Sequence, residues 1–336
     1  CKGQSGPMTD VLFRCDASPQ HGFGHLARCL QLGRMLSEKG FRVWFQGHYS
    51  EGAQHRIEQN GFSGSILSID DQRPMALAIY DTMDNTEDPQ IFDLSALQAV
   101  AKRSTLCVFM ANGLVAPNTV PSNTMVIGYK PSGQNSIPPM VQWGLEFAPT
   151  DIPQDILFNP RKGSLLIALG GGQGNSAMLM ALDVVAGMSS VHHVDILQSP
   201  VGDYVSPEGR LAAHQTFREW SRLPSVFPLI AGSELVLCSY GHFAYEAMAL
   251  GAGVCVVGQK PFQAEYGALL EKAGFAVNAG LLSTISPEAL FQALRKTSSG
   301  CDERSSRATA QIARCGLQRV VDAVLTALND IEVTLK

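Results

Sequence analysis

The chain has 336 residues, 45% of them hydrophobic and 16% charged, with a formal net charge of −5. This composition excludes a disordered chain, and the length favours two domains with separate cores. Lysine and arginine are dispersed, at most two in a row, and no apolar run is long enough to span a bilayer, so we predict no nucleic-acid partner and no membrane insertion.

The eight cysteines are dispersed and form neither a CxxC pair nor a Cys/His cluster at zinc spacing. Some of them, such as Cys238 and Cys255, lie within apolar runs typical of buried strands. This usage favours reduced thiols in a cytoplasmic protein, with no disulfide framework and no metal site. We also predict no cofactor.

In the first half of the chain, short apolar runs alternate with segments of helical periodicity. VLFRC (11–15) predicts a strand, 25–40 an amphipathic helix that ends at a glycine, and 41–47 the next strand, which together make a βαβ unit. Further strands are predicted over 65–69, 76–81, 105–110 and 124–129, and further helices from about Glu51 and Ser95. The proline- and acid-rich stretch 147–163 is typical of a connector.

A second series of strands and helices follows the connector. Strands are predicted over 164–170, 192–198, 225–229, 235–239 and 253–258, with a helix from Asn175. The alternation predicts an α/β fold of two Rossmann-like domains with parallel sheets, residues 8–150 and 164–336, joined by a linker at 151–163. The last helical stretch, about 305–328, fits either a cap on the second domain or a return to the first.

The first strand-to-helix junction, CDASPQHGFGHLARCL (15–30), lies where open α/β sheets bind ligands. Gly22 and Gly24 allow the backbone to turn tightly and to approach a ligand. His25 falls at the helix entry, where the positive end of the helix dipole disfavours an imidazolium, so the neutral ring is a candidate to accept a proton from water. Asp16 is the candidate to orient that ring. The alternative is a helix-entry histidine without a catalytic role.

The segment LLIALGGGQGNSAM (165–178) places three consecutive glycines between a strand and a helix. The backbone N–H groups around Gly171 and Gly172 are suited to a phosphate group. The segment matches neither GxGxxG nor the P-loop, which argues against dinucleotide and ATP chemistry. The alternative is a tight turn without a ligand.

A second turn of small residues occurs in SYGHFAYEAMALG, where Tyr240, Gly241 and His242 lead from a strand into a helix. Glu246 in that helix offers a carboxylate able to accept two ribose hydroxyls, and Gln263 offers an amide donor near the start of the next helix. Taken singly, these two residues are also typical of an ordinary helix acid and a surface glutamine.

Three segments carry a family resemblance. VLFRCDASPQHGFGHLARCLQLG resembles the N-terminal signature of the UDP-2,4-diacetamido-2,4,6-trideoxy-β-L-altropyranose hydrolase family of pseudaminic acid biosynthesis. LLIALGGGQGN and SYGHFAYEAMALG resemble its C-terminal stretches, which share their form with GT-B glycosyltransferases. The resemblance implies a GT-B-like fold whose domains face each other across a cleft. The chain departs from the family after Asp81, where Thr82 and Met83 replace the usual His-Tyr, and at 110–113, where an Asp-Asp pair is common.

By this resemblance, His25 activates the water that attacks the anomeric carbon, Glu246 binds ribose and Gln263 lies near the diphosphate and sugar. Gly171 and the turn at 240–242 lie on the matching phosphate loops. The implied function is an inverting, metal-independent hydrolase that releases UDP from a UDP-(amino/deoxy) sugar in bacterial nonulosonic acid or surface glycan biosynthesis. The alternatives are a GT-B glycosyltransferase with a UDP-sugar donor and a non-catalytic nucleotide-sugar-binding protein.

Overall fold

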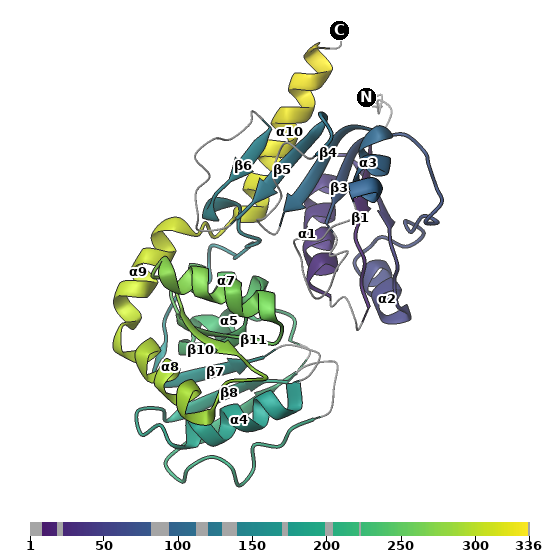
Figure 1. Ribbon diagram of the computed structural model, residues 1–336. Helices are drawn as coiled ribbons and strands as arrows, with labels where there is room; N and C mark the ends of the chain where they lie inside the picture. Colours follow the sequence, from purple (N-terminus) through teal and green to yellow (C-terminus); the bar gives the residue numbers. More distant parts are fainter. Residues whose placement is uncertain are drawn as a thin grey trace. The chain divides into compact units, whose positions relative to one another are not determined.

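The computed structural model describes residues 9–18, 23–81, 94–111, 120–129, 140–169, 174–198, 204–221 and 223–334. The chain divides into two compact units, which are coloured along the sequence in Figure 1. The first unit consists of Cys1–Phe147 and Gly316–Lys336, and the second of Ala148–Cys315.

The first unit is built on a parallel sheet of six strands in the order β2-β1-β3-β4-β5-β6. Its strands are β1 (Asp10–Arg14), β2 (Arg42–Gln46), β3 (Met75–Tyr80), β4 (Ser104–Ala111), β5 (Thr124–Gly128) and β6 (Val141–Trp143). Because β2 and β3 pair with opposite sides of β1, the direction of the strand order reverses between β1 and β3. In open α/β sheets, such a reversal opens a crevice at the carboxyl ends of the two strands.

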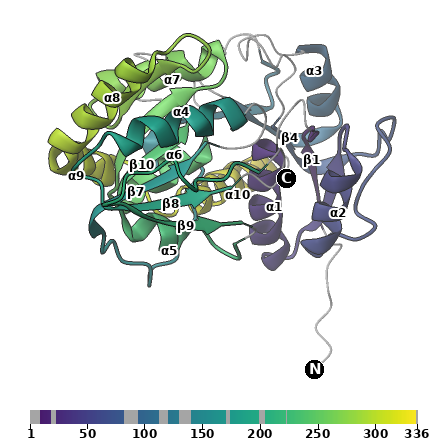
Figure 2. The ribbon, with the colours of Figure 1, turned by 90° about the horizontal axis from the view of Figure 1, so that it is seen from below.

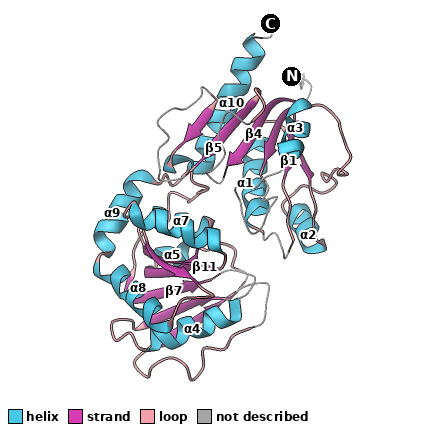
Figure 3. Ribbon diagram, in the orientation of Figure 1, coloured by secondary structure: helices cyan, strands magenta, loops and turns pink. Residues whose placement is uncertain are grey.

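Helices cover both faces of this sheet, as Figure 3 shows. They are α1 (Gly24–Glu38), α2 (Glu51–Gln59), α3 (Leu94–Lys102) and α10 (Gly316–Thr334), with a short 3-10 turn, η2 (Leu145–Phe147). Successive strand residues point to opposite faces. In β1, Val11 and Phe13 pack in the core shared with α1 and α10, whereas Leu12 packs in the core shared with α3.

The last helix, α10, belongs to the first unit, although we had assigned residues up to 336 to the second domain. It lies beside α1 (Figures 1 and 2), and its apolar stripe completes the first core. Leu317, Val320, Val321, Val324 and Leu328 form that stripe. An apolar stripe predicts that a helix packs against a hydrophobic core, but it does not say which of two cores. The periodicity was therefore compatible with packing on either domain.

The second unit is also built on a six-stranded parallel sheet, in the order β12-β11-β10-β7-β8-β9. Its strands are β7 (Arg161–Ala168), β8 (His193–Leu197), β9 (Thr216–Trp220), β10 (Ser233–Ser239), β11 (Gly253–Gly258) and β12 (Val277–Leu281). Its helices are α4 (Gly174–Ala186), α5 (Phe227–Ala231), α6 (His242–Leu250), α7 (Pro261–Lys272), α8 (Pro287–Ser299) and α9 (Cys301–Gln311). The strand order reverses between β7 and β10, so the second crevice lies at their carboxyl ends.

Two of the predicted strands were wrong. Residues 65–69 lie beside β2, the edge strand of the sheet. They form one isolated bridge, from Ile66 to Phe45, and do not extend the sheet as a further strand. Residues 225–229 overlap α5, whose first turn contains Pro228, a residue that is tolerated there. The short strands β6, β9 and β12 were not predicted. The α/β class with two parallel sheets was correct. No helix in the described ranges is both long and apolar enough to cross a membrane.

Candidate functional site

The crevice of the first unit brings His25 and Asp81 together. His25 is the second residue of α1, which follows β1, and Asp81 comes directly after β3. The ring Nδ1 of His25 lies 2.7 Å from Oδ1 of Asp81. The His25 side chain is 12% exposed and that of Asp81 is fully buried. The two strands at which the order reverses therefore deliver a histidine and a carboxylate to one point.

The environment of Asp81 determines which atom carries the proton. Burial favours the neutral acid, but the charge of Arg28 and the hydrogen bonds from Arg28 and His25 outweigh it and hold the pKa of Asp81 below its ordinary value. The carboxyl group is therefore ionised and accepts a hydrogen bond, so Nδ1 of His25 is the donor. In the neutral ring, Nε2 then carries a lone pair, and no residue of the described chain hydrogen-bonds to it.

A buried arginine completes this group. Nε of Arg28 donates to Oδ2 of Asp81 at 2.6 Å, and Nη2 donates to Oδ1. Its Nη1 donates to the hydroxyl of Tyr129, 2.9 Å away, which follows β5. Burial opposes the charge on Arg28, but the carboxylate of Asp81 raises the pKa of the guanidinium. The Arg28–Asp81 pair is thus an ion pair inside the unit.

The position that we predicted for Asp16 is taken by Asp81. Oδ1 of Asp16 instead accepts hydrogen bonds from Nη1 of Arg14 and from the backbone N–H of His48, each at 2.7 Å. The sequence did contain a signal for Asp81, which directly follows a predicted buried strand. Arg28 was also missed, although it lies three residues after His25 and therefore on the same side of the helix.

Gly24 is the first residue of α1, and a Cβ added to it meets no atom within 4 Å. Packing therefore does not require glycine at this position. Gly22 lies outside the described residues.

In the second unit, a chain of hydrogen bonds joins the carboxyl ends of three neighbouring strands. The hydroxyl of Ser239, at the end of β10, donates to the carbonyl of Leu169 after β7 at 2.6 Å. Nε2 of Gln259, after β11, donates to the same carbonyl and to Oγ of Ser239, the latter at 3.0 Å. These bonds hold the starts of α6 and α7 close to the crevice. Neither Ser239 nor Gln259 was among the predicted site residues.

The predicted turn at 240–242 leads into α6. Gly241 is the N-cap, no side chain caps the helix there, and a Cβ added to it meets no atom within 4 Å. His242 is the first helical residue. The hydroxyl of Tyr240 lies 3.0 Å from that of Tyr245. An uncapped helix start with open space before it offers N–H groups to an anion.

Gln263 connects this turn to α7. Its Oε1 accepts hydrogen bonds from the backbone N–H groups of Gln259 at 2.8 Å and Lys260 at 3.2 Å. Its Nε2 donates to the carbonyl of Tyr240 at 3.2 Å. The side chain therefore fixes the two helix starts relative to one another, and the second amide hydrogen is the one that a ligand would use.

Glu246 is a partly buried carboxyl group in α6. Burial, and to a smaller extent the negative charge of Asp151, raise its pKa to about 7. Among the residues that the structure describes, none donates a hydrogen bond to this carboxyl. A carboxyl group whose pKa is strongly shifted, in a helix with an uncapped start, is typical of a functional site.

Two predicted residues cannot be placed, since Gly171 and Gly172 lie outside the described residues. Helix α4 begins at Gly174, directly after that segment. Across the described ranges, no group of three or more His, Cys, Asp or Glu side chains is arranged to hold a metal ion.

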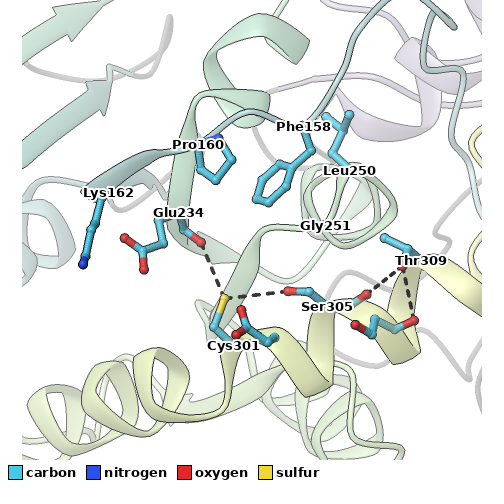
Figure 4. Close-up of a pocket in the computed structure, with 11 residues that line it drawn as sticks. Phe158, Pro160, Lys162, Glu234, Leu250, Gly251, Cys301, Ser305 and Thr309 are labelled. Atoms are coloured by element: carbon cyan, nitrogen blue, oxygen red, sulfur yellow. Dashed lines mark hydrogen bonds between the residues drawn. The ribbon is translucent and has the colours of Figure 1, made fainter.

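A cavity of about 570 Å³ opens at the opposite, amino-terminal edge of the second sheet (Figure 4). Lys162 in β7, Glu234 in β10 and Gly251 after α6 border it, and Cys301 at the start of α9 lies between them. The thiol of Cys301 already contacts the carbonyl of Glu234 and the hydroxyl of Ser305. Because the cavity is at the wrong edge for a parallel-sheet ligand site, we do not assign the nucleotide to it.

The fold resembles that of several solved glycosyltransferases. CalG4, the calicheamicin glycosyltransferase, matches with a TM-score of 0.62 and 14% identity over 97% of this chain and 100% of its own. The glycosyltransferase SnogD from Streptomyces nogalater matches with a TM-score of 0.62 and 13% identity, over 96% of this chain and 100% of its own. The spinosyn rhamnosyltransferase SpnG, in complex with thymidine diphosphate, matches with a TM-score of 0.55 and 14% identity, over 94% of this chain and 100% of its own. No protein-family model and no curated protein matches the sequence.

At these identities the likeness establishes the fold, which is that of the GT-B glycosyltransferases with two Rossmann-like domains. The predicted fold class is thereby confirmed. The prediction of a nucleotide-sugar hydrolase is contradicted, because CalG4, SpnG and SnogD, whose folds this chain resembles, are glycosyltransferases. The comparisons favour the predicted alternative, a GT-B glycosyltransferase, and do not support the specific hydrolase family. That the two domains face each other across a cleft stays a prediction.

Proposed function

We propose that the chain is a glycosyltransferase that moves a sugar from a UDP-sugar to an acceptor hydroxyl group. Both crevices at reversals of strand order carry groups suited to this reaction. The likeness to glycosyltransferases, one of them solved with thymidine diphosphate, supports a nucleoside diphosphate sugar as the donor. A uridine nucleotide is the choice that the sequence resemblance favours.

The observation that carries the proposal is the orientation of His25. Its Nδ1–H is held by the buried carboxylate of Asp81, so the ring is fixed in the tautomer whose Nε2 accepts a proton. In the proposed reaction, Nε2 takes the proton of the acceptor hydroxyl as that oxygen bonds to the anomeric carbon. The bond from this carbon to the phosphate oxygen breaks, and its electron pair leaves with UDP.

The second unit supplies the groups for the nucleotide. The uncapped start of α6 at Gly241 offers backbone N–H groups to the departing diphosphate. The carboxylate of Glu246, which lacks a hydrogen-bond donor in the described chain, accepts the ribose hydroxyls. We place Tyr240, His242 and Gln263 around the diphosphate. These assignments need no metal ion.

The proposal is tested by incubating the protein with a panel of UDP- and TDP-sugars, with and without candidate acceptors, and measuring release of the nucleoside diphosphate. We expect release that depends on an acceptor hydroxyl, with one glycosylated product formed for each nucleotide released. Equal release in the absence of any acceptor would overturn the proposal.

Variants connect the activity to the site. His25→Asn is expected to reduce acceptor-dependent release at least 100-fold, the size of a general-base contribution, and to leave UDP affinity unchanged. The matched control is His55→Ala, since His55 is exposed on α2 and its ring hydrogen-bonds to Gln59 on the same helix. An equal loss in both variants would show that the effect of His25→Asn is not specific.

A further inference from the structure

The carboxylate of Asp81 is saturated with hydrogen-bond donors. Besides Nδ1 of His25, it receives Nε and Nη2 of Arg28 and the thiol of Cys29, whose sulfur lies 3.6 Å from Oδ2. A carboxylate has about four lone-pair positions, so the group is fixed and has no remaining place for water. Arg28 provides two of these bonds and is the only donor among them that is always charged.

The charge balance of this group depends on Arg28. The side chains of Arg28 and Asp81 are both fully buried, so water does not screen them. Together they form a neutral pair, and His25 need not be protonated to balance Asp81. Without the guanidinium, an unpaired buried carboxylate would face the ring of His25 and would stabilise an imidazolium, which has no lone pair left to accept a proton.

The other titratable groups around this pair do not replace Arg28. Arg14, at the end of β1, is paired with Asp16. The hydroxyl of Tyr129, after β5, accepts a hydrogen bond from Arg28, and burial raises the pKa of the Cys29 thiol. Cys15 contacts the hydroxyl of Tyr49 at 3.5 Å, and burial raises the pKa of that hydroxyl as well. Helix α10, which also packs on α1, contributes apolar side chains such as Leu317 and Val320.

We propose that Arg28 is the positioning residue of the His25–Asp81 pair, and that its charge keeps His25 an uncharged base at neutral pH. The inference rests on the proposed transferase function, in which Nε2 of His25 accepts the proton of the acceptor. The hydroxyl of Tyr129 accepts a hydrogen bond from Nη1 of Arg28 and thereby orients Nε and Nη2 of the guanidinium toward Asp81. Arg28 acts through Asp81 and does not contact the reacting atoms.

The test compares Arg28→Gln, which removes the charge, with Arg28→Lys, which retains it. Proton NMR follows the titration of the His25 ring in each protein, assigned by the signal that is lost in His25→Asn. In Arg28→Gln the midpoint of this titration is expected to rise by at least one pH unit, a tenfold increase in proton affinity. The acid limb of kcat should move with it while KM for the UDP-sugar is unchanged. Arg28→Lys should restore both toward wild type.

A purely structural role predicts lower activity in both variants without a moved midpoint, and that result overturns the inference. The NMR measurement needs no substrate, so a shifted midpoint without transfer to any acceptor would refute the proposed function and retain the role of Arg28. If neither variant folds, ¹⁵N chemical shifts of the wild-type ring decide. A neutral ring protonated on Nδ1 at pH 7.5 supports the inference, and an imidazolium at that pH overturns it.

Discussion

Replacing Glu246 by glutamine tests whether this carboxyl group is held in an unfavourable environment that a ligand would relieve. Burial and the charge of Asp151 raise its pKa from the ordinary 4.5 to about 7. Each tenfold change in proton affinity corresponds to about 1.4 kcal/mol, so ionisation costs the folded state about 3 kcal/mol. The side chain is partly exposed, and solvent screening reduces this to about 2 kcal/mol.

The sign follows from the raised pKa. Between about pH 4.5 and 7 the folded protein binds more protons than the unfolded chain, so stability falls as the pH rises through this window. Glutamine resembles the neutral acid and does not ionise. At pH 8, Glu246→Gln should therefore be more stable than wild type by about 2 kcal/mol, which for a unit of this size raises Tm by about 4–8 °C. At pH 4.5 the two proteins should be equally stable.

Thermal unfolding monitored by circular dichroism at both pH values measures the effect, and the transition to compare is that of the second unit. Glu265→Gln is the matched control, because Glu265 is exposed on the neighbouring helix α7. If Glu246→Gln shows no stability gain at pH 8 beyond that of the control, the carboxyl is not desolvated and our reasoning about Glu246 as a ligand site loses its physical basis.

Three further predictions concern binding and turnover. If ribose hydroxyls donate to the ionised Glu246, a UDP-sugar should bind about tenfold more tightly at pH 8 than at pH 6 by calorimetry, and Glu246→Gln should abolish this dependence; equal affinity at both pH values would remove Glu246 from the site. Gly241→Ala should leave Tm unchanged, because the added methyl meets no protein atom, but should weaken UDP binding at least tenfold; unchanged affinity would show that no ligand approaches this helix start. Transfer activity should withstand exhaustive EDTA treatment, and activity lost with EDTA and restored by Mg²⁺ or Mn²⁺ would reveal a metal site that we have not identified.

The sequence predicted the site best where one short segment contains all of its parts. The segment 15–30 includes the end of a strand, a glycine-containing turn and the start of a helix, so His25 at the helix entry followed from local pattern. The same applies to Gly241, which lies between β10 and α6. Such positions depend on φ/ψ preferences and periodicity, which are properties of neighbouring residues.

The partners of these residues could not be predicted in the same way. Asp16 is nine positions from His25 in the sequence, yet Asp81, fifty-six positions away, holds the ring. The pairing arises because β1 and β3 are adjacent in the sheet, and strand order is set by which hydrophobic faces pack together and not by local pattern. Gln263 was predicted as a ligand contact because it lies near the start of a helix and matches a glutamine of the resembled family. Only the structure shows that its side chain links two helix starts.

By itself, the sequence determined an α/β protein with two parallel sheets and located most of the strand-to-helix junctions, because alternating apolar runs and helical stripes are local signals. Tertiary structure alone decided that α10 completes the first core and that Asp81 and Arg28 form a buried ion pair behind His25. An apolar stripe fits any core of suitable shape, and a charged residue is buried only where a partner of opposite charge is brought to it. Both outcomes depend on contacts between residues far apart in the chain.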